Sequence, residues 1–115
     1  MNIHIEKVDH TDATVITIDG QLNSATTSQI QDQVLTSARG GRRVLLDMSG
    51  VNYLSSAGLR MLLLLYRRVQ ENQGMMALAG LSEEVSDVMS ITGFLDLFTI
   101  YSNRNDGLSA FRKAG

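Results

Sequence analysis

Two adjacent hydroxyl groups, on Ser55 and Ser56, are the side chains of this chain with the clearest potential for chemistry. They stand between an apolar segment that ends in Asp47 and the apolar run 61–66, where a helix is expected to begin. The free N–H groups and the dipole at a helix N-terminus favour a phosphate. Serine is also a preferred N-cap residue. The sequence therefore predicts either a phosphate-accepting hydroxyl or a structural cap at this point.

The residues around these serines argue against hydrolysis by an activated serine. A nucleophile elbow requires Gly-x-Ser-x-Gly. Gly58 follows Ser56 at the right distance, but Leu54 occupies the place of the first glycine. The histidines, His4 and His10, both belong to the first strand region, and nothing places either beside Ser56 as a base. We therefore expect no catalytic residue and no enzyme activity.

Cofactor, metal and nucleic-acid binding are disfavoured by composition. The chain has no cysteine, no Gly-Lys-Ser or Gly-Lys-Thr phosphate-binding loop, and no His, Asp and Glu cluster with metal-ligand spacing. It carries 10 Lys and Arg against 12 Asp and Glu, a net charge of −2. Binding to nucleic acid needs many more cationic contacts. We expect no cofactor, no metal and no nucleic-acid partner.

The chain also lacks the patterns of secretion and membrane insertion. Its N-terminus has no basic region followed by an apolar stretch. The run 61–66 is far shorter than the roughly 20 apolar residues of a membrane helix. We expect a cytoplasmic protein without membrane contact.

The elements that must position the serines alternate along the chain. With 115 residues, 43% hydrophobic and 19% charged, the sequence predicts one globular domain over residues 1–115. Strands are expected at 3–8, 13–18, 43–47, 75–79 and 97–101. Helices are expected from Asn23 or Ser24 to about 38, across 59–69, from Ser82 to Gly93, and from an Asp106 cap to 111.

This β-β-α-β-α-β-α-β-α order predicts an α/β fold. We expect one mixed, mostly parallel sheet of about four or five strands with about four helices, the first strand lying at an edge. A turn at 9–12 joins the first two strands, Gly40 and Gly41 end the first helix, and residues 48–54 form a connecting loop.

Three features leave alternatives open. Asp47 either satisfies loop N–H groups or lies near Ser56 and helps a kinase to orient the hydroxyl. Tyr53 is either exposed to a partner or folded over the core. The methionines either form an adaptable partner surface or fill the core: Met48, Met61, Met75, Met76 and Met89.

Three segments together resemble a known family. They are Gly20-Gln21-Leu22-Asn23, Leu45-Leu46-Asp47-Met48-Ser49-Gly50-Val51 and Tyr53-Leu54-Ser55-Ser56-Ala57-Gly58-Leu59-Arg60. They resemble the anti-sigma factor antagonists, which are single-domain members of the STAS superfamily. The resemblance covers the whole chain in length and element order and implies a STAS-like fold.

The resemblance implies a non-catalytic bacterial partner-switching protein. Such a protein, when unphosphorylated, binds an anti-sigma factor or a related serine kinase of the histidine-kinase-like ATPase fold and frees that kinase's client. The kinase phosphorylates one serine, and a PP2C-type phosphatase removes the phosphate. The acceptor position falls on Ser56. Many members carry Asp directly before the acceptor. Here a second serine, Ser55, stands at that place, and it is the second choice as acceptor.

The resemblance also implies a partner-binding surface, and Asp47 is expected to be a supporting residue of this surface. Its members are Gly20, Gln21, Leu22, Asn23, Ser49, Tyr53, Ser55, Ser56, Ala57, Gly58 and Arg60. Gly58 is expected to keep the surface around Ser56 low. The alternative is a STAS scaffold or ligand-binding subunit of a larger complex, without phosphoswitching. We expect a monomer, because no long exposed apolar strand edge is evident.

Overall fold

The computed structural model describes residues 2–8, 13–38 and 43–114. Their elements follow the predicted order. They are β1 (Asn2–Val8), β2 (Ala13–Leu22), α1 (Ser24–Ser37), β3 (Arg43–Leu54), α2 (Ser56–Glu71), β4 (Met75–Ala79), α3 (Glu83–Ile91), a 3-10 turn (Leu95–Leu97), β5 (Thr99–Tyr101) and α4 (Arg104–Ala114). The expected turn at 9–12 and the glycines Gly40 and Gly41 lie outside the described residues.

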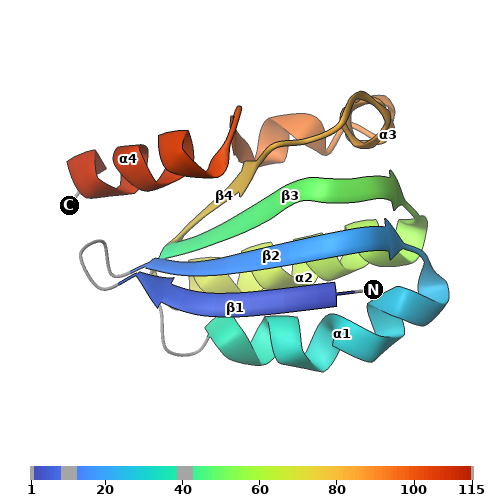
Figure 1. The fold of residues 1–115 in the computed structure, drawn as a ribbon, viewed down its shortest axis with the longest axis horizontal. Coiled ribbons are helices and arrows are strands. Elements are labelled where there is room, and N and C mark those ends of the chain that lie inside the picture. Colours follow the sequence, from blue (N-terminus) through green and yellow to red (C-terminus); the bar gives the residue numbers. More distant parts are fainter. Residues whose placement is uncertain (1, 9–12, 39–42, 115) are drawn as a thin grey trace.

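The strands form one five-stranded sheet in the order β1-β2-β3-β4-β5 (Figure 1). β1 pairs with β2 in the antiparallel sense, and the other neighbours are parallel. Each parallel pair is joined by a helical crossover, which such a pairing requires. The predicted mixed, mostly parallel sheet with the first strand at an edge is confirmed.

Helices pack on both faces of this sheet. Side chains alternate along β3, so Val44 and Leu46 join a large apolar cluster built with α1, α2 and α3, whereas Leu45 joins a smaller cluster. The smaller cluster includes Leu108 and Phe111 of α4. Figure 1 shows α4 on the opposite side of the sheet from α1 and α2. The start of α2 is therefore held by the larger core.

Most of the five methionines considered above fill the core. Met48, Met61, Met76 and Met89 are buried, and Met75 is 44% exposed. The core-filling interpretation is confirmed for these four side chains.

The expected loop at 48–54 is wrong, because β3 continues without interruption to Leu54. β2 likewise continues to Leu22, and the two strands pair through two register shifts. At each shift β3 carries one more residue than β2, and Gly20 adopts φ 122°. Such β-bulges break the alternation of apolar and polar residues by which a strand is predicted from sequence.

Two boundaries near the C-terminus also differ from the prediction. Residues 95–97 form a 3-10 turn, so the last strand begins only at Thr99. The last helix begins at Arg104, and the N–H of Asp106 donates to Oδ1 of Asn103 at 2.9 Å. Asn103 is thus the cap, and Asp106 lies in the first turn, where a carboxylate suits the helix dipole.

Candidate functional site

The structure gives Ser55 and Ser56 different roles at the start of α2. Ser55 is the N-cap residue, and its Oγ accepts the N–H of Gly58 at 3.2 Å. Its carbonyl oxygen accepts the N–H of Leu59 at 2.9 Å. Ser56 is the first residue of the helix, and its side chain is exposed. The capping function therefore belongs to Ser55, and the hydroxyl of Ser56 is accessible from outside.

The start of α2 is fixed to the end of β2. The N–H of Ser55 donates to the carbonyl oxygen of Leu22 at 2.8 Å. Gly58 is buried, and a Cβ at that position would lie 2.8 Å from Leu54 Cδ1, 2.9 Å from Leu22 Cβ and 3.0 Å from Leu22 O. Gly58 thus permits close packing inside the protein. The expectation that it keeps the outer surface low is wrong, because its missing side chain would point inward.

The start of α1 lies beside the start of α2. Asn23 caps α1 through Oδ1, which accepts the N–H of Thr26 at 2.9 Å, and its own N–H donates to Thr26 Oγ1 at 3.0 Å. Because β2 and β3 are parallel, α1 and α2 begin at the same end of the sheet (Figure 1). Ser24 and Ser56 are therefore the first residues of two neighbouring helices.

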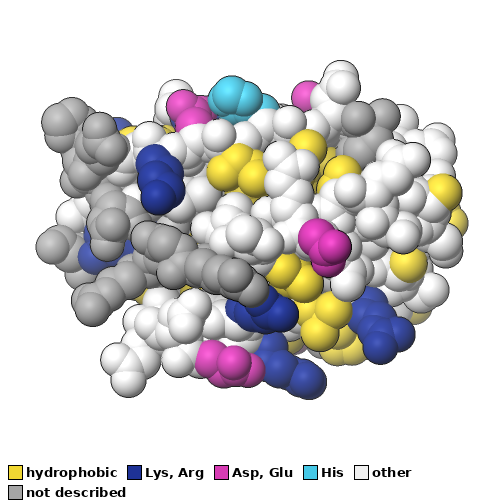
Figure 2. All heavy atoms as spheres, turned by 90° about the horizontal axis from the view of Figure 1, so that it is seen from below, with side chains coloured by type: hydrophobic (Ala, Val, Ile, Leu, Met, Phe, Trp, Pro, Cys, Tyr) yellow, Lys and Arg dark blue, Asp and Glu magenta, His cyan; other side chains and the backbone are white. Residues whose placement is uncertain are grey.

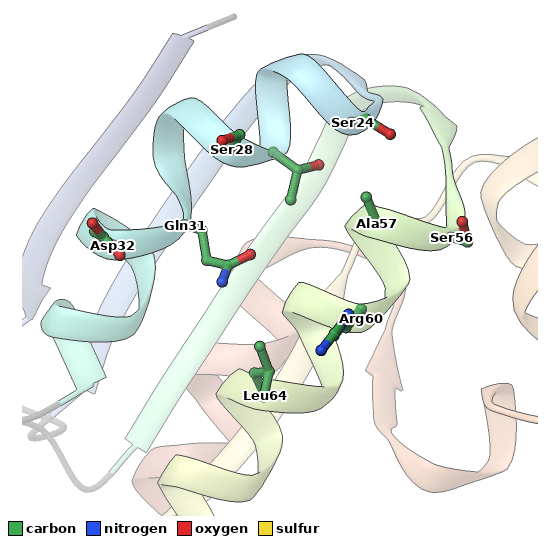
Figure 3. Close-up of a pocket in the computed structure, with 9 residues that line it drawn as sticks. Ser24, Ser28, Gln31, Asp32, Ser56, Ala57, Arg60 and Leu64 are labelled. Atoms are coloured by element: carbon green, nitrogen blue, oxygen red, sulfur yellow. The ribbon is translucent and has the colours of Figure 1, made fainter.

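An open groove of about 700 Å³ lies between these helices and reaches Ser56 (Figure 3). Polar and acidic side chains of α1 line one side of this groove, and residues from the first turns of α2 line the other. The lining residues are Ser24, Thr27, Ser28, Gln31, Asp32, Ser56, Ala57, Arg60 and Leu64. Figure 3 shows Gln31 pointing from α1 into the space between the helices, with Arg60 on α2 across from it.

The sequence analysis missed the contribution of α1 to this groove. A signal was present, since Ser24, Ser28 and Asp32 recur every four residues on the face of a helix. The spacing of apolar residues predicts which face of this helix is buried, but not which element its polar face adjoins.

Thr27 has an unusual environment on the α1 side of the groove. It is 2% exposed, and its Oγ1 has no hydrogen-bond partner among the described residues. Most buried hydroxyl groups in proteins have a partner. This hydroxyl is therefore an unsatisfied polar group buried in the wall of the groove.

Asp47 and Ser49 lie apart from Ser56. Asp47 Oδ1 accepts the N–H of Ser49 at 3.1 Å and its hydroxyl at 2.8 Å. Both residues line a second cavity, of about 300 Å³, together with Gly80, Ser102, Asn103, Arg104 and Asn105. The structure thus supports the interpretation that Asp47 satisfies local donors, and it does not bring Asp47 to the groove of Ser56.

The other predicted partner-binding residues differ in accessibility. Gln21, Tyr53 and Arg60 are exposed, Tyr53 by 50%. Gly20, Asn23, Ser55 and Ala57 are half-buried, and Leu22 is fully buried in the larger apolar cluster. The side chain of Leu22 therefore supports the surface from inside.

The surface on the α1 side is mainly polar. Figure 2 views the molecule from the side on which β1 and α1 lie in Figure 1, and its apolar areas are small and separated by polar atoms. Among the described residues, no group of three or more His, Asp or Glu is arranged to hold a metal ion. None of the described helices is long and apolar enough to cross a membrane.

Comparison with known proteins defines the class of this fold and site. The family model of the STAS domain matches residues 4–107, so the chain belongs to the STAS domain family. BtrV of Bordetella bronchiseptica, named as a candidate anti-sigma factor antagonist, is 33% identical over 115 residues, which are 99% of this chain and 97% of that protein. This chain is accordingly a STAS-domain anti-sigma factor antagonist, a family of non-catalytic regulators.

Solved structures agree with this assignment at the level of the fold. An anti-sigma factor antagonist domain from Planctomyces limnophilus superimposes with a TM-score of 0.85 at 24% identity, over 95% of this chain and 97% of that one. The antagonist SpoIIAA in its unphosphorylated form gives 0.84 at 18% identity, over 97% of both chains. The phosphorylated form of SpoIIAA from Bacillus gives 0.76 at 18% identity, over 96% of this chain and all of that one.

Proposed function

We propose that this protein is the phosphorylatable antagonist of a bacterial partner switch. In its unphosphorylated form it binds an anti-sigma factor or a related serine kinase of the histidine-kinase-like ATPase fold, and it thereby releases that kinase's client. Phosphorylation of Ser56 blocks the binding, and a PP2C-type phosphatase restores it. The observation that carries this proposal is the exposed hydroxyl of Ser56 at the first residue of α2, beside a serine that already serves as the cap.

Phosphorylation at this position is compatible with the fold. A phosphate adds a charge of about −1.5 to −2, and the positive end of the helix dipole tolerates it. The cap formed by Ser55 and Gly58 remains in place, because neither group is modified. The effect of the phosphate falls on the surface, where it opposes a partner's acidic groups or nucleotide phosphates. A coupling of about 1–3 kcal/mol changes affinity roughly 5–150-fold.

The binding surface follows from what is accessible around Ser56. It comprises Gln21 and Asn23 before α1, the exposed part of the α2 start with Ala57 and Arg60, and the polar face of α1 along the groove. Gly20, Leu22 and Gly58 support this surface from within. Tyr53 is exposed on β3 opposite Gln21 and extends this surface, whereas Ser49 lines the separate cavity with Asp47.

Similarity to SpoIIAA supports the proposed modification. That protein has been solved in a phosphorylated and an unphosphorylated form, and this chain matches the fold of both. The 33% identity with BtrV extends over nearly the whole chain and supports an anti-sigma factor as the partner class.

The deciding experiment is intact-mass and fragment mass spectrometry of the protein isolated from its native cells, with Ser56→Ala and Ser55→Ala as matched controls. One phosphate that is lost only in Ser56→Ala supports the proposal. Purified Ser56→Ala should then bind the cognate kinase constitutively, and Ser56→Asp should bind it more weakly. Equal affinity of the two variants would refute the switch.

A second candidate function rests on the separate cavity lined by Asp47, Gly80 and Arg104. In α/β sheets, ligands gather at the carboxyl ends of parallel strands. Gly80 directly follows β4, and Asp47 lies within β3 at the point where its pairing with β4 ends. This cavity favours a STAS scaffold or ligand-binding subunit. A protein that carries no phosphate under any growth condition, and that co-purifies with a larger complex, would support this alternative.

A further inference from the structure

Arg60 lies one helical turn after Ser56 on α2. Residues four apart on a helix have Cβ atoms about 5–6 Å from each other, so their side chains meet on the same face. Both residues line the groove between α1 and α2 (Figure 3). Arg60 is also exposed, so its guanidinium can turn toward either end of the groove.

The guanidinium of Arg60 is not engaged in the unphosphorylated protein. Across residues 2–8, 13–38 and 43–114, the structure records an ion pair between Arg104 and Glu6 but no ion pair or hydrogen bond of Arg60. Asp32 is the acidic residue in the groove lining, yet it does not pair with Arg60. The groove therefore holds a cation that lacks a partner anion.

An independent feature of the groove also indicates a polar ligand. Thr27 is buried, and its Oγ1 has no partner among the described residues. Burial of a hydroxyl without a hydrogen bond is costly. The wall of the groove therefore contains a polar group that the described residues do not satisfy.

We propose that Arg60 binds the phosphate of phosphorylated Ser56 as an ion pair along this groove. The inference rests on the proposed function for the phosphorylation itself. A planar guanidinium matches the oxygens of a phosphate in a bidentate arrangement. The order along the helix is also favourable, because the anion precedes the cation by four residues.

This pair changes the partner-binding surface in two ways. The phosphate adds a dianion at Ser56, and Arg60 is withdrawn from any acidic group of the partner that it contacts before phosphorylation. Phosphorylation then removes an attraction as well as adding a repulsion. The mechanism needs no change in the backbone of α2.

The test uses protein with phosphoserine encoded genetically at position 56, so that it does not depend on any kinase. The ³¹P resonance is followed through a pH titration in the native background and in Arg60→Gln. A nearby cation favours the dianion and lowers the second pKa of the phosphate, which is ordinarily near 6. The midpoint should lie about 0.2–0.7 pH units lower with Arg60 than with Gln, as expected for exposed ion pairs.

Arg67→Gln is the matched control. Arg67 is an exposed arginine on the same helix, eleven residues after Ser56. It therefore lies on nearly the same face of the helix as Ser56, but about 16 Å further along the axis. Its replacement should leave the midpoint unchanged. Arg60→Lys should keep part of the shift, because lysine retains the charge without the planar fork.

A second readout is the Nε–Hε resonance of Arg60, which should move when Ser56 carries the phosphate. Equal midpoints for the native background and Arg60→Gln would overturn the proposal, as would equal shifts for Arg60→Gln and Arg67→Gln. Failure of the kinase to phosphorylate Ser56 is measured separately by mass spectrometry. It would refute the proposed function without altering this titration.

Discussion

Replacement of Gly58 by alanine tests whether the start of α2 depends on close contact with β2. The new Cβ would lie 2.8 Å from Leu54 Cδ1, 2.9 Å from Leu22 Cβ and 3.0 Å from Leu22 O. Leu54 can move its methyl group, but Leu22 meets the new atom with its Cβ and its backbone. Because the carbonyl of Leu22 also accepts the N–H of Ser55, displacement of α2 weakens that hydrogen bond.

The net cost follows from two opposing contributions. Overpacking of a well-packed core costs about 1–3 kcal/mol. Alanine regains up to about 1 kcal/mol of helix propensity relative to glycine. We therefore expect Gly58→Ala to lower the free energy of unfolding by about 1–2 kcal/mol. With a urea m-value of about 2 kcal/mol/M, the unfolding midpoint falls by roughly 0.5–1 M.

Gly107→Ala is the matched control. Gly107 is also buried and lies in the first turn of a helix, α4, but the new Cβ would meet only the side chain of Leu45, with Cδ1 at 2.8 Å and Cδ2 at 3.1 Å. These methyl groups can rotate away, so the gain in propensity offsets most of the cost. The reasoning is refuted if Gly107→Ala lowers the urea midpoint as much as Gly58→Ala, or if Gly58→Ala raises it.

Further predictions use the same urea assay. Ser55→Ala should lower the free energy of unfolding by about 1 kcal/mol through loss of the N-cap, whereas Ser56→Ala should change it by less than about 0.5 kcal/mol. Equal losses would contradict the separate roles of the two serines. Thr27→Val should raise the free energy of unfolding by about 1 kcal/mol, because it removes a buried hydroxyl without a partner; a loss would show that the hydroxyl is satisfied in solution. Glu6→Gln breaks a half-exposed ion pair with Arg104 and should cost less than about 1 kcal/mol, with no difference from the native protein in 1 M salt.

The order of elements could be predicted from the sequence because each strand and helix carries its own periodic pattern. The run 44–46, between Arg43 and Asp47, is continuously apolar, as expected for a strand buried on both faces. The continuation of β3 through residues 48–54 could not be predicted in the same way. Its two extra residues relative to β2 place Met48, Val51 and Leu54 at intervals of three, which match neither a regular strand nor a loop.

The candidate site was predictable only where neighbours in sequence are also neighbours in space. Ser55, Ser56 and Arg60 lie on one helix, so a motif contains all three. The groove pairs Ser56 and Arg60 with residues of α1, among them Gln31, and that pairing depends on how α1 and α2 pack. Asp47 shows the opposite case, because it is close to Ser56 in sequence but lines another cavity.

The hydrogen bond between Ser55 N–H and Leu22 O joins the segment before α1 to the start of α2. Gln21, Asn23 and Ser56 are therefore carried on one stiff unit, which the cap of each helix and the packing of Gly58 reinforce. A partner that binds this surface does not have to order it first, so little conformational entropy is lost on this side of the complex. In the proposed switch, phosphorylation then acts mainly through the charge of this surface, and the two forms should meet the partner with the same shape.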